Sequence, residues 1–163
     1  MKRIITAAVA IGTVLTSLIF ASCGKQESEE KKSVPVIGIS QYGEHPSLDN
    51  CRTGFIEGLK EAGLTEGTDF EIDYQNAGFD DNIATQIAQN FSAKNVALMC
   101  GIATNSATAC FAAAEDKNIP VIFNAITDPV KAKLDSGNVT GVSDKLPVEA
   151  QLDLIRKLQP EAK

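Results

Sequence analysis

The sequence has no tryptophan, one histidine and two tyrosines among its 163 residues. The single histidine, His45, leaves little material for acid–base chemistry. Neither a Gly-x-Ser-x-Gly motif nor a paired-carboxylate motif occurs. Because a hydrolase needs a nucleophile, a base and a group that orients the base, the sequence disfavours an enzyme. The stretch 38–43, Gly-Ile-Ser-Gln-Tyr-Gly, lacks the second glycine of a dinucleotide-binding turn.

Cysteine is also sparse, with four residues at positions 23, 51, 100 and 110. The last three have neither metal-ligand spacing nor the pattern of a disulfide framework. We expect Cys51, Cys100 and Cys110 to be small buried hydrophobic side chains, with a Cys100–Cys110 bridge as the alternative. No zinc, haem or iron–sulfur motif occurs, so we expect no metal and no cofactor.

Basic residues are outnumbered by acidic ones. The chain has 15 Lys and Arg against 21 Asp and Glu, for a formal net charge of −6. Without Lys2 and Arg3, the remaining 13 bases leave a charge of −8. This balance argues against nucleic acid and against an anionic lipid surface as partners.

The only long apolar run, residues 4–20, follows the positive charges of Lys2 and Arg3. It is shorter than the roughly 20 residues of a membrane-spanning helix and has the layout of a secretory signal. The ending Phe-Ala-Ser-Cys resembles the bacterial lipobox, apart from Phe20 in place of the usual Leu. We therefore expect a signal peptide over 1–22, a lipidated Cys23 and an extracytoplasmic chain anchored to the cell membrane. An ordinary cleaved signal and an uncleaved anchor helix are the alternatives.

Residues 24–33 are polar and charged, with no apolar side chain to bury. Such a segment does not offset its ordering entropy. We expect residues 23–33 to form a lipidated cysteine followed by a flexible tether.

From residue 34 onward, strand and helix patterns alternate. Runs rich in β-branched and apolar residues predict strands at 36–40, 70–74, 96–100, 120–123 and 138–142. Apolar residues at steps of three and four predict the intervening helices. The first is capped by Ser47 and ends at Gly63, the second starts at Asp80 or Asp81, and the third runs from Thr104 or Asn105 to about Asp116. A last helix has Pro147 in its first turn.

Strands separated by helices indicate right-handed βαβ units and a doubly wound parallel α/β sheet. In a flavodoxin-like strand order 2-1-3-4-5, ligands bind at the carboxyl ends of the strands near the switch point. Three polar segments follow strands there: 41–49, 101–106 and 124–128. We expect them to converge on one site.

Four motifs carry a resemblance to a known family. They are Ile-Ser-Gln-Tyr-Gly-Glu-His-Pro-Ser-Leu-Asp at 39–49, Gly-Ile-Ala-Thr at 101–104, Ala-Ile-Thr-Asp-Pro at 125–129 and Gly-Asn-Val-Thr-Gly-Val-Ser-Asp at 137–144. In this order and spacing, they resemble the ABC transporter substrate-binding family related to tryptophan- and tyrosine-binding lipoproteins. The resemblance implies one lobe of a type I periplasmic-binding-protein-like fold, an ABC permease as partner and an aromatic amino acid as ligand. It assigns 34–143 to the N-terminal lobe and 144–163 to a crossover helix toward a second lobe.

An amino-acid ligand needs both of its charges paired when it leaves water. The third helix offers its N-terminus to the carboxylate, with added donors from Thr104, Asn105 and Thr127. Asp128 is the expected partner of the ammonium group, with Asp49 as the other available acid. The remaining wall is expected to comprise Gln41, Tyr42 and His45, with Tyr42 stacking on an aromatic side chain.

Each of these residues has a structural alternative. Thr104 and Asp49 are also suitable as helix-capping residues, Asp128 before Pro129 is a good turn residue, and His45 can bond within its loop. Two other functions remain open from the sequence. One is a lipid-anchored sensory binding protein without an importer, and the other is an α/β-fold envelope enzyme.

Overall fold

The computed structural model describes residues 33–161, so the predicted signal sequence and Cys23 lie outside the described residues. Five parallel strands form one sheet in the order β2-β1-β3-β4-β5, which confirms the predicted topology. The strands are β1 (Val36–Gln41), β2 (Glu71–Asn76), β3 (Leu98–Ile102), β4 (Val121–Ile126) and β5 (Val139–Ser143).

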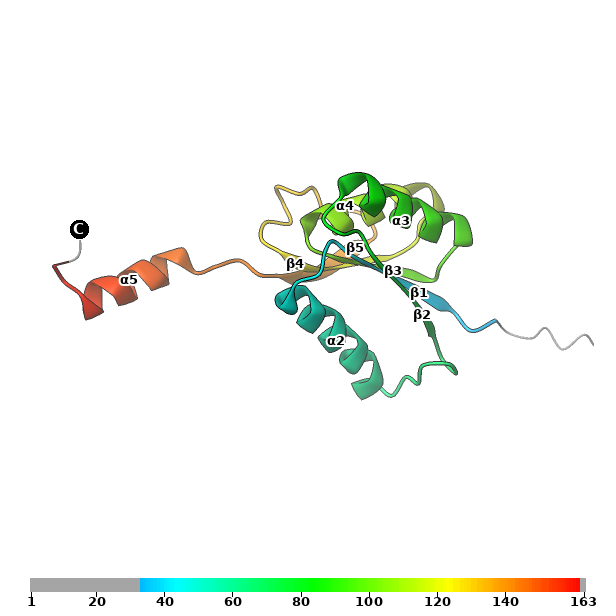
Figure 1. Cartoon of the computed structure of the whole chain (residues 1–163), viewed down its shortest axis with the longest axis horizontal. Helices are drawn as coiled ribbons and strands as arrows, with labels where there is room; N and C mark the ends of the chain where they lie inside the picture. Colours follow the sequence, from blue (N-terminus) through cyan, green and yellow to red (C-terminus); the bar gives the residue numbers. More distant parts are fainter. Residues whose placement is uncertain (1–32, 162–163) are drawn as a thin grey trace, which may run out of the picture. The chain divides into compact units, whose positions relative to one another are not determined.

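Helices cover both faces of the sheet (Figure 1). One face carries α2 (Pro46–Glu61), and the other carries α3 (Asp81–Lys94) and α4 (Thr104–Ala114), which continues into the 3₁₀ turn η1 (Glu115–Lys117). The chain changes face once, between α2 and α3, as expected of a doubly wound fold.

The helix starts follow from local hydrogen bonding. Asp80 caps α3 as predicted, because its side chain accepts from the backbone N–H groups of Asn82 and Ile83. The prediction for α2 was wrong: its N-cap is His45, whose Nδ1 accepts from the backbone N–H of Ser47 at 3.2 Å. Pro46 takes the first helical position, where a missing N–H is tolerated, so the cap falls earlier in the chain than Ser47.

The core has two main parts, one on each face of the sheet. On the α3 and α4 face, the predicted stripe of α3 (Ala84, Ile87, Ala88 and Phe91) is buried against Met99 and Cys110. On the α2 face, Ile37 and Ile39 alternate toward the helix and pack with Cys100 and Ile102. Successive residues of β1 therefore point to opposite faces of the sheet, so that β1 contributes to both parts of the core.

The three cysteines of the described part are free. Cys100 and Cys110 are buried as expected, and burial raises the pKa of each thiol to about 12. Cys51 was also expected to be buried but is only partly buried. It shares this with the rest of α2, which has no fully buried residue. The alternative of a Cys100–Cys110 bridge is not seen in the structure. Thiols with such high pKa values are unreactive at neutral pH.

All five strands end later in the chain than the sequence pattern indicated, and β3 and β4 differ most in a way that shapes the carboxyl edge. β3 covers 98–102 instead of 96–100, and β4 continues three residues past Phe123. Ile102 pairs with Asn124, and the Ala103 N–H donates to the Asn124 carbonyl at 3.0 Å. The polar residue Asn124 is thus held by the backbone ladder, which depends little on side-chain type.

The last helix, α5 (Val148–Leu158), begins directly after Pro147. Its apolar side chains Leu152, Ile155 and Leu158 are exposed, and the helix has no buried residue. Within residues 33–161, no helix is both long and apolar enough to cross a membrane.

The position of α4 depends on a glycine in β3. A Cβ added to Gly101 would lie 2.4 Å from the Cα of Ala107, so helix and strand are in direct backbone contact. Both residues are buried. No larger residue fits between them without moving α4.

We predict that Gly101→Ala lowers the free energy of unfolding by about 1–3 kcal/mol, the usual cost of overpacking a core. Gly58→Ala is the matched control, because a Cβ there meets nothing within 4 Å. Because Gly58 lies inside α2, this substitution should instead stabilise by about 0.5–1 kcal/mol. Urea unfolding followed by circular dichroism measures both. Equal stability of Gly101→Ala and the wild type would show that α4 is not held at this contact.

Candidate ligand-binding site

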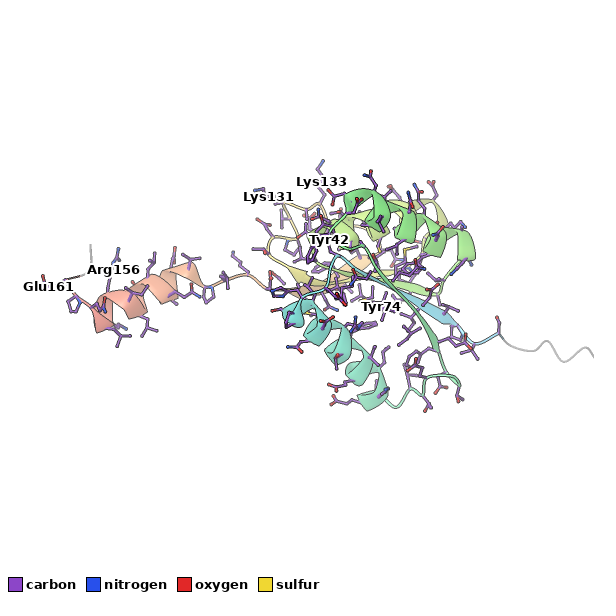
Figure 2. The ribbon with its side chains drawn as sticks, viewed as in Figure 1. Tyr42, Tyr74, Lys131, Lys133, Arg156 and Glu161 are labelled. Atoms are coloured by element: carbon purple, nitrogen blue, oxygen red, sulfur yellow. The ribbon has the colours of Figure 1, made fainter. Side chains whose placement is uncertain are left out.

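The segments after β1, β3 and β4 meet at the carboxyl edge of the sheet. Figure 2 shows Tyr42 at the end of β1 and Lys131 on the loop after β4, both at this edge. Two small residues turn the chain there with positive φ, Ala103 (72°) after β3 and Ala125 (56°) within β4. Such backbone is uncommon for residues other than glycine and is concentrated at functional sites.

The N-terminus of α4 is open at this edge. Its N-cap residue, Ala103, has φ 72° and ψ 158° and makes no side-chain capping bond. The first turn of a helix presents backbone N–H groups without intrahelical partners and the positive end of the helix dipole. This end of α4 is therefore suited to an anion.

A surface pocket of about 520 Å³ adjoins the start of α4. It is lined by Thr104, Thr127, Asp128, Lys131 and Ala132. Three of the residues predicted to bind the ligand thus come from two different strand ends to one pocket. Its volume lies in the range of small-molecule sites.

Asp128 has a structural role as well as a place in the pocket. Its Oδ1 accepts from the backbone N–H of Lys131 at 3.0 Å, which closes the turn after β4. The side chain is exposed, and its Oδ2 has no hydrogen bond within the described residues. The turn and a ligand contact are therefore compatible.

A second hollow, of about 320 Å³, lies on the other side of the α4 start and is lined by Asp81, Thr85, Asn105, Thr108 and Ala109. Asp81 is its centre: Oδ1 accepts from the Tyr42 hydroxyl at 2.8 Å and from Asn105 Nδ2 at 2.6 Å. Two predicted site residues, Tyr42 and Asn105, thus meet on an acid that the sequence marked only as a helix start.

These bonds shift the titration of both partners. Hydrogen bonds from Asn105 and then Tyr42 lower the pKa of Asp81. The hydrogen bond to the Asp81 carboxylate, followed by desolvation and the charge of that carboxylate, raises the pKa of Tyr42 above its ordinary value of 10.0. The signal for Asp81 in the sequence was its place one residue after the helix cap, at the carboxyl edge.

Gln41 lies deeper than the other predicted site residues. It is fully buried, and its Nε2 donates to the Gly43 carbonyl at 2.8 Å and to Asp49 Oδ1 at 2.9 Å. Its Oε1 accepts from Arg52 Nη1 at 2.9 Å. All of these bonds are internal, so Gln41 shapes the loop after β1.

Arg52 is a residue that the sequence did not single out. It forms an ion pair with Asp49 at 3.4 Å, and its guanidinium lies 4.3 Å from the centre of the Tyr74 ring. Asp49, the alternative partner for an ammonium group, therefore already has a cation beside it. His45 is exposed and serves as the α2 cap.

A buried pair joins β1 to α4. The Ser40 hydroxyl donates to the Ser106 hydroxyl at 3.2 Å, and both side chains are fully buried. Within residues 33–161, no group of His, Cys, Asp and Glu side chains is arranged to hold a metal ion.

We predict that the phenol of Tyr42 titrates above its ordinary pKa and that Asp81→Asn lowers this pKa toward the ordinary value. A neutral partner at position 81 no longer opposes formation of the phenolate. The chain has no tryptophan and two tyrosines, so in a Tyr74→Phe background the ultraviolet absorbance of phenolate reports Tyr42 alone. Identical titration curves with and without the Asp81→Asn substitution would contradict the contact.

Comparison with solved structures identifies the fold. A leucine-binding protein from Thermotoga maritima superposes on 78% of the chain with a TM-score of 0.58 at 17% identity. At that identity the likeness shows the fold alone, which is a type I periplasmic-binding-protein-like lobe.

Three relatives are much more similar in sequence. The tyrosine-binding protein of Clostridioides difficile (strain R20291) is 41% identical over 145 residues, which cover 85% of this chain and 41% of that protein. A solved structure of an ABC domain in complex with L-Trp, from Streptococcus pneumonia, is 38% identical with a TM-score of 0.73. A ligand-free, open substrate-binding protein with adhesive properties from Clostridium difficile is 40% identical, also with a TM-score of 0.73.

Each of these two solved structures aligns with 80% of this chain, and the aligned part makes up 45% of the solved chain. The chain thus spans less than half the length of the relatives it matches. A family model described as ABC transporter substrate binding protein matches residues 36–163, nearly all of the described part. This family consists of substrate-binding proteins and not of enzymes. The chain belongs to the ABC transporter substrate-binding protein family.

Proposed function

We propose that this chain is the N-terminal ligand-binding lobe of the extracytoplasmic solute-binding component of an ABC importer, and that its ligand is an aromatic amino acid. The observation that carries the proposal is the open N-terminus of α4 beside the pocket of Thr104, Thr127 and Asp128. This arrangement offers positive and negative partners within one small site.

The carboxylate of the ligand is assigned to the first turn of α4. The backbone N–H groups there and the dipole favour an anion, and the hydroxyls of Thr104 and Thr127 add donors from two strand ends. A backbone site of this kind is already in place before the ligand arrives, so little ordering is needed on binding.

The ammonium group is assigned to Asp128. The Oδ1 atom is held by the turn, which fixes the carboxylate, and the second oxygen is left for the ligand. Asp49 is the weaker choice because Arg52 and Gln41 already bond to it.

The relatives support the class of ligand. One is named a tyrosine-binding protein, and another is solved with L-Trp. Each is about 40% identical to this chain over the matched residues. Tyr42, at the carboxyl edge next to α4, is proposed to contact the aromatic ring.

A second lobe is proposed to complete the site. Thr127 and Asp128 are exposed, and so are the apolar side chains of α5. Residues 144–163 are proposed as the crossover toward that lobe, and an ABC permease as the partner of the whole protein. A ligand held on one wall keeps much of its surface wet, so closure supplies the remaining contacts.

We predict that the described lobe binds L-tryptophan and L-phenylalanine weakly, with dissociation constants of about 0.1–1 mM, which corresponds to about 4–5.5 kcal/mol. Asp128→Asn should weaken binding about tenfold or more, because hydrogen bonds between charged groups contribute about 1.5–3 kcal/mol. The measurement is a titration followed by amide NMR, which detects millimolar binding.

Asp49→Asn is the matched control, since it removes an acid of the same edge whose partners are Arg52 and Gln41. It should leave the affinity unchanged, with melting curves to detect any loss of stability. If no amino acid causes saturable shifts, the proposed function is wrong. If Asp49→Asn abolishes binding while Asp128→Asn does not, the ammonium site is misassigned.

Membrane attachment is a separate part of the proposal, carried by Cys23 in the sequence Phe-Ala-Ser-Cys. We predict that Cys23 is lipidated, with stable anchoring by more than one acyl chain. Expression in a bacterium supplied with labelled fatty acid should label the wild type and leave Cys23→Ala unlabelled. Equal labelling of the two proteins would exclude an anchor at this residue.

A further inference from the structure

We propose that Phe79 is the specificity-determining residue of this lobe, the platform on which the aromatic ring of the ligand packs. The inference rests on the proposed function and adds a residue to it. Phe79 lies on the loop between β2 and α3, at the same carboxyl edge as the start of α4.

The backbone of Phe79 is in an unusual conformation. Its φ is 63°, directly after Gly78 at 61°. A bulky residue at positive φ is a clear outlier with a strained backbone. The conformation is held by the Phe79 N–H, which donates to the Tyr42 carbonyl at 2.7 Å. The strain is thus tied to the position of Tyr42.

The side chain is exposed in spite of this strain. Phe79 has 56% of its surface accessible, the largest value for any aromatic side chain within residues 33–161. A phenyl ring in water forgoes the stabilisation that its burial would bring. The strained backbone and the exposed part of the ring do not stabilise the described lobe, which favours a role in binding.

The ring is nevertheless fixed on two sides. It meets the Tyr42 ring edge to face, with centroids 5.7 Å apart and planes at 89°. It also lies over Gly43, where an added Cβ would come within 2.3 Å of the Phe79 ring. A rigid aromatic side chain loses little entropy when a ligand packs on it.

A single residue, Tyr42, connects Phe79 to the polar part of the site. Tyr42 joins the Phe79 ring on one side and Asp81 on the other, and Asp81 also accepts from Asn105 in the first turn of α4. The apolar surface therefore borders the end of α4 that is assigned to the carboxylate. An amino acid bound there by its charges can direct its side chain toward Phe79 and Tyr42.

This arrangement gives a defined selectivity. Aromatic pairs contribute beyond simple burial by an amount that corresponds to about threefold to tenfold in affinity. We expect the lobe to prefer L-phenylalanine over L-alanine by at least that factor, since the two share the same charged groups.

The test compares L-phenylalanine with L-alanine by amide NMR titration of the wild type and three variants. Phe79→Leu removes the ring and keeps an apolar side chain, and Phe79→Tyr restores a ring. Leu64→Ala is the matched control, because Leu64 is also an exposed apolar residue (40%) but follows α2 at the opposite edge. Melting curves and spectral dispersion verify that each variant is folded.

The expected result is that Phe79→Leu loses the preference for L-phenylalanine by about threefold to tenfold, while its affinity for L-alanine is unchanged. Phe79→Tyr and Leu64→Ala should retain the preference. A preference that survives in Phe79→Leu, or a parallel loss for both ligands, would overturn the inference. Equal binding of the two amino acids by the wild type would also overturn it and leave the charge-binding site intact. If neither amino acid binds, the proposed function fails and the platform with it.

Discussion

Direct backbone contact between β3 and α4 is the constraint on which the site depends. Because Gly101 has no side chain, α4 lies directly against β3 at Ala107. A single residue, Ala103, connects the end of β3 to the start of α4. The buried Ser40–Ser106 bond ties the same helix to β1. The first turn of α4 is thereby fixed at the carboxyl edge, with its N–H groups uncovered by any capping side chain. A site made of backbone groups is as rigid as the sheet that carries it.

The charged groups around α4 have distinct roles because their partners differ. Asp81 receives two donors, from Tyr42 and Asn105, and Asp49 is joined to Arg52 and Gln41. Among the described residues, the Asp128 side chain accepts only from the backbone N–H of Lys131. A ligand ammonium group therefore finds the least satisfied carboxylate at Asp128, while the other two acids hold the loops in shape.

Much of the fold could be predicted from the sequence because it rests on periodicity. The stripe of α3 and the cap at Asp80 follow from spacing and from local bonds, and the parallel order follows from alternation of strands and helices. Convergence of Thr104, Thr127 and Asp128 could be anticipated from the same topology, since parallel strands end at one edge.

Side-chain direction could not be predicted in the same way. Gln41 has the composition of a ligand contact, but at the last position of β1 it points inward to Arg52 and Asp49. Asp81 and Phe79 lie after a strand with no marked motif, and their contacts with Tyr42 form between residues far apart in the sequence. Such contacts depend on tertiary packing, which a single sequence does not reveal.

The central claim is that the first turn of α4 takes the carboxylate of the ligand. Amide NMR with two ligands that carry one charged group each, phenylpropionate and phenethylamine, tests it directly. The account predicts that phenylpropionate shifts the N–H resonances of Thr104, Asn105 and Ser106 and that phenethylamine does not. Shifts of these amides by phenethylamine alone, or phenylpropionate shifts confined to the opposite edge around Gly137 and Asn138, would contradict it.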